Sequence, residues 1–240
     1  MSFQTPIVSV VIPCYNDKAY IKETVDAVLN QTFQDVEIII VDDGSNQATK
    51  ELLITLVSDK VRVITQENKG LSAARNIGFK EANGEFVLTI DSDDTVDPTF
   101  LEKALVILNK NKSIGAVSSH VSIFEKDHQF IAIHTPNGGI LKDFLFDNNS
   151  VSFALIRKEA WQEIGGYDEK MRNGFEDWEF WIAITKKGWE IAMIEQLLFN
   201  YRQKPVSMSK DAKENYREAN LNYIYKKHQD VYSNHFLEVV

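Results

Sequence analysis

Residues 86–98 read Phe-Val-Leu-Thr-Ile-Asp-Ser-Asp-Asp-Thr-Val-Asp-Pro, an apolar run followed by four carboxylates within seven residues. The apolar run is typical of a buried β-strand. Carboxylates crowded at a strand end repel one another and lose hydration unless a cation or hydrogen-bond donors compensate them. Because residues i and i+2 of an extended segment point to the same side, Asp91 and Asp93 can face one small volume. The pattern therefore predicts a divalent metal site beyond this strand.

This stretch has two other interpretations. Asp97 before a proline is typical of a helix N-terminus, which explains one or two acids but leaves Asp91 and Asp93 unexplained. An EF-hand calcium loop would place Asp91, Asp93 and Glu102 at its positions one, three and twelve. That interpretation fails because position six is Val96 instead of glycine, and because the preceding segment is a predicted strand instead of a helix.

The composition limits the class of protein. The 240 residues carry 26 basic and 35 acidic side chains, a net charge of −9, and 44% of them are hydrophobic. These values predict an ordered globular domain and argue against a general nucleic-acid binder. The sequence shows neither an apolar run of 18 residues nor a signal-peptide pattern. We therefore expect a cytoplasmic protein without a transmembrane segment, with at most peripheral contact at the inner face of the membrane.

The single cysteine, Cys14, cannot form an internal disulfide. A reducing compartment is the simplest inference. We expect Cys14 to be an ordinary small side chain in a turn and not a nucleophile.

Apolar strand patterns alternate with amphipathic helical patterns in the first half of the chain. Strands are expected at 7–13, 36–41, 61–65 and 86–90, and each is followed by a helix, the helices ending near residues 30, 57, 82 and 110. Strands that are apolar on both faces and alternate with helices predict a parallel sheet covered on both sides.

The pattern changes after residue 115. We expect a strand pair at 116–125 and 130–134, a loop at 136–139, a strand at 150–157, a helix at 158–164, a helix at 177–187, a strand at 191–201 and a helical tail from residue 211. The second half therefore does not continue the strand–helix repeat.

Three predicted strand ends carry polar turns, at residues 13–16 (Pro-Cys-Tyr-Asn), 42–45 (Asp-Asp-Gly-Ser) and 91–94 (Asp-Ser-Asp-Asp). In a parallel sheet these ends lie along one edge, so we expect them to converge on a single crevice. A nucleotide suits this crevice, because Asp42 can accept the imide N–H of a uracil or the hydroxyls of a ribose, while a metal at Asp93 neutralises a diphosphate. The alternative for residues 42–45 is a tight turn with a helix cap.

Residues 69–78 (Lys-Gly-Leu-Ser-Ala-Ala-Arg-Asn-Ile-Gly) place a helix start after a flexible loop. Arg75 on this helix can contact a phosphate or a carboxylate of the site, or form a structural salt bridge. The sequence lacks both a Gly-x-Gly-x-x-Gly fingerprint and a P-loop, so a nicotinamide enzyme or an NTPase would have to bind phosphate by other means.

Seven motifs in order give the chain a family resemblance. They are Val8-Ser-Val-Val-Ile-Pro-Cys-Tyr-Asn16, Val41-Asp-Asp-Gly-Ser45, Asn68-Lys-Gly-x4-Ala-Arg-Asn-x-Gly78, Asp91-Ser-Asp-Asp94, Gly165-Gly-Tyr-Asp-Glu169, Glu176-Asp177 and Tyr201-Arg202. This series, from about residue 6 to residue 209, resembles that of the family 2 glycosyltransferases, which are inverting enzymes of the GT-A fold. The resemblance implies a Rossmann-like α/β domain, its mostly parallel sheet flanked by helices. Residues 1–119 would form a nucleotide-sugar-binding half, 120–209 a mixed-sheet acceptor half, and 210–240 a C-terminal helical tail.

The resemblance also implies roles for individual residues. The donor-binding set is Pro13, Tyr15, Asp42, Asp43, Arg75, Asp91, Ser92, Arg202 and Lys204. Asp93 and Asp91 would hold Mn²⁺ or Mg²⁺, and Trp178 and Tyr167 would contact the acceptor. Asp177 would be the catalytic base, with the adjacent Glu176 as the obvious substitute.

The chemistry of inverting transfer agrees with this division of roles. An acceptor hydroxyl attacks the anomeric carbon from the face opposite the nucleoside diphosphate. A metal stabilises the departing diphosphate, while a carboxylate takes the proton from the hydroxyl. The alternative for Asp177 is a first-turn acid favoured by the helix dipole. That dipole would lower the pKa of Asp177, so Trp178 and Trp181 would have to desolvate the site.

One position departs from the family pattern. Many relatives have a histidine after the Tyr-Arg pair, whereas this chain continues Gln203-Lys204-Pro205. A charged lysine is not a usual metal ligand. We therefore expect a metal with fewer protein ligands, completed by diphosphate and water, and a direct phosphate contact from Lys204 or Arg202.

The sequence thus predicts a metal-dependent glycosyltransferase of hexosyltransferase type. It would move a sugar from a nucleotide diphosphate donor, a UDP-sugar, to a hydroxyl of a glycan or lipid-linked acceptor in polysaccharide or glycoconjugate biosynthesis, without a nucleic-acid partner. A sugar nucleotidyltransferase is the nearest rival, but it should show a glycine-rich basic loop after the first strand. A non-catalytic, metal-dependent binder of nucleotide or carbohydrate is the second rival, and it would never turn over a donor.

Overall fold

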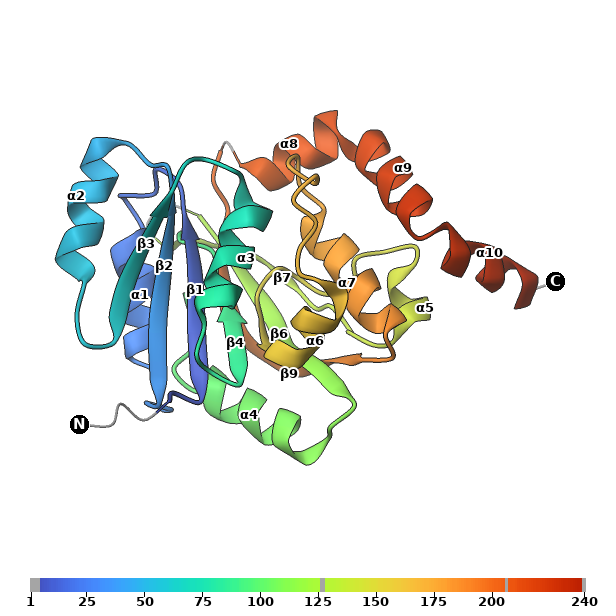
Figure 1. Ribbon diagram of the computed structural model, residues 1–240, viewed down its shortest axis with the longest axis horizontal. Helices are drawn as coiled ribbons and strands as arrows, with labels where there is room; N and C mark the ends of the chain where they lie inside the picture. Colours follow the sequence, from blue (N-terminus) through green and yellow to red (C-terminus); the bar gives the residue numbers. More distant parts are fainter. Residues whose placement is uncertain (1–4, 126–127, 206, 239–240) are drawn as a thin grey trace.

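A single mixed sheet runs through the molecule (Figure 1). The computed structural model describes residues 5–125, 128–205 and 207–238. The strand order is β3-β2-β1-β4-β8-β6-β9-β5, and β7 pairs with β6. The strands are β1 Val8–Cys14, β2 Val36–Asp43, β3 Val61–Gln66, β4 Phe86–Thr89, β5 Thr95–Val96, β6 Ile114–Phe124, β7 Phe130–His134, β8 Ala154–Arg157 and β9 Glu190–Arg202.

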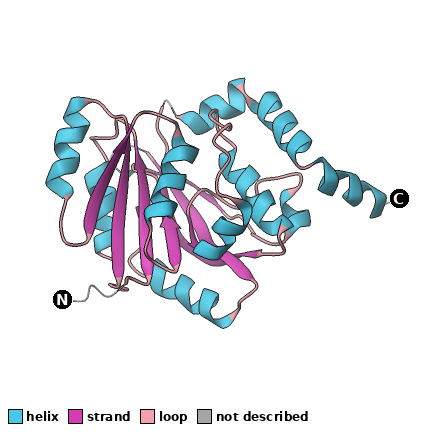
Figure 2. Cartoon of the chain, viewed as in Figure 1, coloured by secondary structure: helices cyan, strands magenta, loops and turns pink. Residues whose placement is uncertain are grey.

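The helices lie on both sides of this sheet (Figure 2). They are α1 Ile21–Leu29, α2 Gln47–Leu56, α3 Leu71–Glu81, α4 Phe100–Lys110, α5 Leu141–Phe144, α6 Lys158–Ile164, α7 Glu176–Lys186, α8 Met208–Asn215, α9 Arg217–Lys227 and α10 Gln229–Glu238. The alternation of strands and helices predicted for the first half is confirmed.

The first four strands of the chain form the parallel part of the sheet. β1 pairs in parallel with β2 and β4, and β2 pairs in parallel with β3. All seven residues of β1 are buried. A strand that is covered on both faces needs apolar side chains on both faces, which explains its continuous apolar sequence.

The second half adds antiparallel pairs, as the change of pattern after residue 115 predicted. β8 runs antiparallel to both β4 and β6, while β6 runs parallel to β9. The two-residue strand β5 was not predicted. It pairs antiparallel with β9, setting Thr95 opposite Asn200 and Val96 opposite Phe199. This pairing brings the segment after the Asp-rich turn beside the end of β9.

Two apolar cores lie on opposite faces of the sheet. Side chains of α1, α2 and α4, such as Val25, Leu53 and Leu101, pack on one face. Side chains of α3, α6 and α7, such as Phe79, Trp161 and Trp181, pack on the other face. Within α7, Trp181 and Ile182 are fully buried and Trp178 is 9% exposed. Burial of these large apolar side chains supplies most of the free energy that holds the helices against the sheet.

The C-terminal tail forms three helices instead of the one that was predicted. Helix α8 ends at Asn215, Tyr216 lies between α8 and α9, and α9 ends at Lys227. Ile224 of α9 is buried against the body. Helix α10 extends beyond the sheet (Figure 1).

Two smaller expectations need correction. Helix α4 begins at Phe100 and not at Pro98, where the Asp97-Pro98 pair predicted its start. The Asp97 carboxylate accepts hydrogen bonds from the backbone N–H and the hydroxyl of Thr99, ahead of the helix. Cys14 is the last residue of β1 and not part of a turn. Burial raises the pKa of its thiol to about 11, which is unfavourable for a nucleophile. The short helix α5 carried no predictive pattern.

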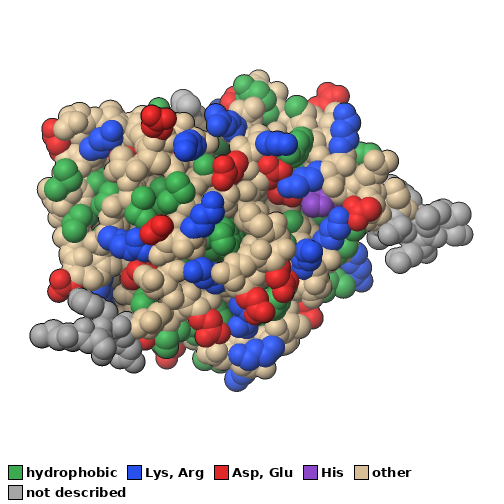
Figure 3. Space-filling model, in the orientation of Figure 1, with side chains coloured by type: hydrophobic (Ala, Val, Ile, Leu, Met, Phe, Trp, Pro, Cys, Tyr) green, Lys and Arg blue, Asp and Glu red, His purple; other side chains and the backbone are tan. Residues whose placement is uncertain are grey.

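None of the helices within the described ranges is both long and apolar enough to cross a membrane. Basic and acidic side chains are interspersed on the face shown in Figure 3. Peripheral contact with a membrane stays a prediction.

Candidate active site

The three polar strand-end turns converge as predicted. The backbone amide of Asn16 donates to Ser45 Oγ at 3.0 Å, and the amide of Asn46 donates to Asn16 Oδ1 at 2.8 Å. The turn after β4 joins them, because Ser92 Oγ donates to Asp17 Oδ2 at 2.7 Å. The carboxyl ends of β1, β2 and β4 therefore form one continuous edge.

Asp42 presents a buried acceptor at this edge. Its side chain lies at the end of β2 and only 1% of the residue is exposed. One oxygen, Oδ1, accepts from the backbone amide of Ser45 at 2.9 Å. The other, Oδ2, is buried without a hydrogen-bond partner among the described residues. A buried acceptor without a donor is costly, so a ligand N–H or O–H would be stabilised here.

The neighbouring Asp43 orders the loop before α3. Its carboxylate accepts from the Gln66 side chain at 2.6 Å and from the backbone amides of Lys69 and Gly70 at 2.8 and 2.9 Å. Gly70 has a φ of 93°, a conformation that favours glycine. Contact of Asp43 with a donor stays a prediction.

Pro13 and Tyr15 flank the end of β1 in different environments. Pro13 is a buried residue of β1 opposite Val41 of β2. Tyr15 is 53% exposed at the edge. The Tyr15 ring is therefore accessible for stacking on a base, whereas Pro13 is covered. Contact of Pro13 with a donor stays a prediction.

Arg75 links the two halves of the site. Its guanidinium is buried and donates from Nη2 to Asp91 Oδ1 and from Nη1 to Glu176 Oε1, both at 2.8 Å. It also lies over the ring of Tyr167, 5.3 Å from the centroid. Burial opposes the charge, but the two carboxylates outweigh it and raise the pKa of Arg75 above its ordinary value. The carboxylate contact considered from the sequence is thus present, and a phosphate contact stays a prediction.

Asp91 keeps part of its surface open. Its side chain is 27% exposed, and its second oxygen lies 3.4 Å from Ser152 Oγ. Ser92, by contrast, is buried, and its carbonyl accepts from Thr24 Oγ1 at 2.9 Å. Ser92 holds the turn in place, and its contact with a donor stays a prediction.

Asp93 pairs with a lysine. Lys204 Nζ lies 2.6 Å from Asp93 Oδ2 and 3.1 Å from Asp17 Oδ1. Burial raises the pKa of Asp93, and the charge of Lys204 opposes that rise. Burial would lower the pKa of Lys204, but Asp93 and Asp17 outweigh it, so the lysine pKa lies above its ordinary value. The two groups are therefore held as an ion pair.

Arg202 is fixed at the end of β9. Its Nε donates to the Asp93 carbonyl at 2.8 Å and its Nη2 to Glu23 Oε2 at 2.6 Å. The guanidinium lies between the rings of Tyr20 and Phe124, 4.6 and 4.5 Å from their centroids. This packing leaves Arg202 6% exposed. Its contact with a donor stays a prediction.

The residues present do not fit a metal held by protein side chains. Within the described part of the chain, there is no group of three or more His, Cys, Asp or Glu side chains placed to hold a metal ion. Asp91 is paired with Arg75 and Asp93 is paired with Lys204. The two predicted metal ligands therefore already have cationic partners.

Two acids begin α7 on the far side of Arg75. Glu176 is buried and bound by Arg75, whereas Asp177 is partly buried and accepts from Asn148 Nδ2 at 2.9 Å and from the Trp178 amide at 2.8 Å. Burial raises the pKa of both carboxyls, against the opposing effects of Arg75 on Glu176 and of Asn148 on Asp177. Both pKa values thus lie above their ordinary values, whereas the helix dipole was expected to lower that of Asp177.

The two predicted acceptor contacts are mostly buried. Tyr167 stacks on Phe180 with a centroid distance of 3.9 Å and is 3% exposed. Trp178 donates from Nε1 to the Phe144 carbonyl at 2.6 Å and is 9% exposed. Any contact of either side chain with an acceptor stays a prediction.

Several residues of the site were not predicted. Asp17 contacts Lys204 and Glu23 contacts Arg202. Asn148 contacts Asp177, and Ser152 contacts Asp91. Asp17 directly follows a predicted polar turn, so its position gave a usable signal. Asn148 and Ser152 lie in a stretch without a motif, and tertiary packing alone brings them to the site.

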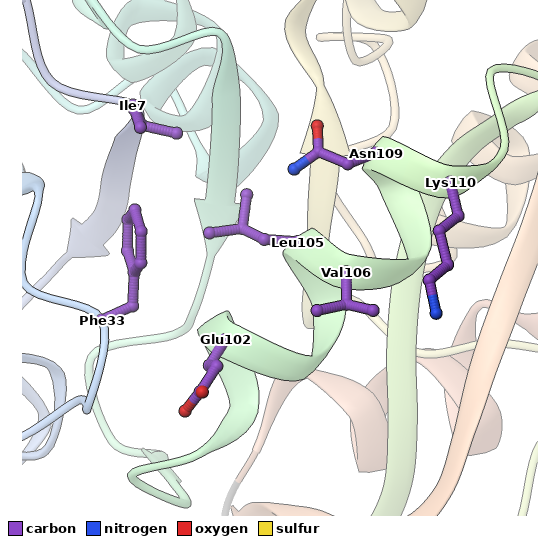
Figure 4. A pocket seen from close by; sticks show the side chains of 7 residues that line it. All are labelled: Ile7, Phe33, Glu102, Leu105, Val106, Asn109 and Lys110. Carbon is purple, nitrogen blue, oxygen red and sulfur yellow. The ribbon is translucent and has the colours of Figure 1, made fainter.

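Two hollows lie outside this carboxylate cluster. The first, shown in Figure 4, is lined by Ile7, Phe33, Glu102, Leu105, Val106, Asn109 and Lys110. Ile7 precedes β1, so this groove lies at the opposite end of the strands from the polar turns. The second is lined by Leu145, Phe146, Trp178, Arg217, Leu221, Tyr225 and Tyr232. Trp178, the third residue of α7, is the part of that helix that lines the second hollow.

A mostly parallel sheet flanked by helices, with an Asp-x-Asp pair beyond its central strand, defines an α/β protein of the GT-A fold. The solved structure of S. aureus TarS residues 1–349 in complex with UDP-GlcNAc has a similar fold, with a TM-score of 0.69 and 20% sequence identity. The similarity covers 84% of this chain and 60% of that one.

The chain belongs to glycosyl transferase family 2, whose sequence pattern matches residues 9–165. An uncharacterized glycosyltransferase of Haemophilus influenzae is 29% identical over 212 residues, which cover 82% of this chain and 65% of that protein. Hyaluronan synthase of Pasteurella multocida is 30% identical over 192 residues, which cover 77% of this chain and 19% of the synthase. The chain thus spans less than two thirds of the length of these relatives.

Proposed function

We propose that this glycosyltransferase transfers a hexose-type sugar from a UDP-sugar to a hydroxyl of a glycan or lipid-linked acceptor, with inversion at the anomeric carbon. One observation carries the proposal. Arg75 binds Asp91 of the strand-end edge and Glu176 of α7 at the same time. Arg75 therefore holds two groups of acids close together. The acids of the strand-end edge suit a nucleotide, and the acids of α7 suit proton removal.

The donor would lie along the strand-end edge. Asp42 Oδ2 is a buried acceptor that the uracil imide or a ribose hydroxyl would satisfy, and the exposed Tyr15 ring can stack on the base. We propose donor contacts from the set that the sequence indicated, namely Pro13, Tyr15, Asp42, Asp43, Arg75, Asp91, Ser92, Arg202 and Lys204. The UDP-GlcNAc bound by TarS, a protein of the same fold, supports a nucleotide-sugar donor.

The acceptor would approach from α7. Its hydroxyl oxygen forms the new bond to the anomeric carbon while the bond from that carbon to the diphosphate oxygen breaks. The electron pair of the broken bond leaves with UDP, and the hydroxyl proton passes to Asp177. The raised pKa of Asp177 suits this role, because a base with a pKa closer to neutrality accepts a proton more readily.

Neighbouring residues would prepare this base. Asn148 donates to Asp177 and orients one carboxylate oxygen. Glu176 is occupied by Arg75, which makes Asp177 the better candidate of the two acids. None of these steps is assigned to a divalent metal ion, since Asp91 and Asp93 already pair with side-chain cations.

The two halves proposed from the sequence meet within one sheet. The boundary between residues 119 and 120 falls inside β6, which spans Ile114–Phe124. We propose residues 1–119 for donor binding and 120–209 for the acceptor. The helical tail from residue 210, which takes in most of α8 and then α9 and α10, would be a further wall of the acceptor side. The hollow lined by Trp178 and by Tyr225 and Tyr232 of this segment would accept a sugar ring by stacking.

A panel of nucleotide sugars, scored by thermal stabilisation and then by UDP release, tests the proposal. Stabilisation by UDP-sugars, followed by UDP release that Asp177→Asn suppresses, is the expected result. Stabilisation without any turnover would favour a non-catalytic binder. Formation of UDP-sugar and pyrophosphate from UTP and a sugar phosphate would instead identify a nucleotidyltransferase.

A further inference from the structure

Lys204 lies between two carboxylates, those of Asp17 and Asp93. Its ammonium contacts the carboxylates of Asp93 and Asp17, and it also lies over the Tyr20 ring, 5.6 Å from the centroid. The side chain is 26% exposed, so the ammonium is neither buried in the core nor fully solvated. The loop after β1 and the turn after β4 thus hold one positive charge at the edge where the donor would lie.

The fold places Lys204 there by a long-range pairing. The two residues of β5 pair with the end of β9, and the Asp94 carboxylate accepts from the backbone amide of Arg202 at 2.8 Å. The Arg202 side chain in turn donates to the Asp93 carbonyl. The backbone two residues before Lys204 is therefore anchored to the same turn that carries Asp93.

A divalent ion would have to compete with this ammonium. Mg²⁺ binds a carboxylate oxygen at roughly 2.1 Å, and Lys204 Nζ already lies 2.6 Å from Asp93 Oδ2. An ion on that oxygen would lie next to the lysine charge and be repelled by it. Asp91, the other predicted ligand, carries the buried guanidinium of Arg75. Asp91 and Asp93 are therefore both paired with side-chain cations.

We infer that Lys204 takes the place of a divalent cation in this chain and binds the diphosphate of the donor directly. The inference rests on the proposed function. An ammonium has three N–H donors, and the contacts with Asp93 and Asp17 use two of them, which leaves one for a phosphate oxygen. The same charge would stabilise the diphosphate as it departs, because a cation held in place needs no rearrangement during the reaction.

Calorimetric titration of the full chain tests this inference. Wild-type protein should bind UDP with the same affinity, within about threefold, in EDTA and in MgCl₂ or MnCl₂. Lys204→Met should weaken UDP by about 10- to 100-fold in EDTA, the usual effect of losing a charge-assisted contact. Uridine, which has no phosphate, should bind Lys204→Met and wild type equally, a result that a merely structural role of Lys204 does not predict. Lys204→Arg should retain most of the UDP affinity.

Lys210→Met is the matched control, because Lys210 is exposed on α8 and its ion pair is with Glu214 instead of Asp93 or Asp17. Its UDP affinity should equal that of wild type. UDP binding by wild type that requires the metal would overturn the inference and leave the glycosyltransferase proposal intact. Equal loss of UDP and uridine in a folded Lys204→Met would also overturn it. If wild type binds no UDP under either condition, the proposed function falls and the inference falls with it.

Discussion

Arg75 and Glu176 are separated by 101 positions in the chain and meet in a buried ion pair of 2.8 Å. Arg75 belongs to α3, which packs on the parallel part of the sheet, and Glu176 begins α7, which packs on the mixed part. Since Arg75 also binds Asp91, this one guanidinium determines how far the strand-end edge lies from the acids of α7.

The first prediction concerns this pair. Arg75→Met should lower the free energy of unfolding by about 3–5 kcal/mol, because it leaves the buried Glu176 carboxylate without its cation. Urea denaturation monitored by circular dichroism measures this loss. Arg172→Met, at an exposed position, is the control and should change stability little. Equal midpoints for Arg75→Met and wild type would show that the pair contributes no stability.

The second prediction assigns the base. Asp177→Asn keeps the shape of the side chain but removes its basicity, so transfer should fall by about 10²- to 10⁴-fold. UDP affinity should stay within a few-fold of wild type, because Asp177 is proposed to act on the acceptor. If Glu176→Gln abolishes transfer while Asp177→Asn leaves it intact, Glu176 is the base. If neither change matters, the carboxylate mechanism is wrong.

The third prediction is a pH dependence. A base works only when ionised, so kcat/KM should fall as the pH drops through the pKa of Asp177, which burial raises above its ordinary value. The hydrogen bond from Asn148 opposes that rise. Asn148→Ala should therefore move the acidic limb of the pH profile to higher pH. Asn222→Ala, at an exposed site of α9, should not move it. If the acidic limb of the Asn148→Ala profile stays at the wild-type pH, Asn148 does not affect the pKa of the base.

The fourth prediction concerns the nucleoside. Asp42→Ala removes the buried acceptor Oδ2 and should weaken UDP by about 10-fold or more, while binding of inorganic pyrophosphate changes little. Titration of both ligands measures the difference, with Asp59→Ala at an exposed position as the control. Equal weakening of UDP and pyrophosphate would place the nucleoside away from Asp42.

The donor edge could be predicted from sequence because its signals are local. The apolar runs of β1, β2 and β4 mark buried parallel strands, and the polar turns that follow them must share an edge. The prediction that the turns carrying Asp42, Asp91 and Asp93 share one edge is confirmed.

The side chains that pair with these acids could not be predicted, because they come from distant parts of the sequence and are brought there by tertiary packing. The strand β5 has two residues, too few for a periodic pattern, yet its pairing with β9 brings Lys204 to Asp93. The sequence indicated that a charged Lys204 is a poor metal ligand but not that it would bind the predicted metal ligand itself. Asn148 reaches Asp177 from a stretch without a motif.

The C-terminal tail shows a further limit of sequence patterns. Its polar, helix-forming composition predicted one helix, but the tail is divided into three helices at Tyr216 and His228. The reason lies in tertiary contacts, since Glu179 of α7 accepts from Lys227 and His228 at 2.8 Å each. A buried carboxylate on another helix thus fixes where α9 ends.

A crystal structure of Asp177→Asn with a UDP-sugar that stabilises the protein tests the central claim most directly, because this variant should bind the donor without consuming it. The account predicts a uracil or ribose group within hydrogen-bond distance of Asp42 Oδ2 and an anomeric carbon that faces residue 177. A nucleotide bound elsewhere, for example in the groove of Figure 4, would contradict the account.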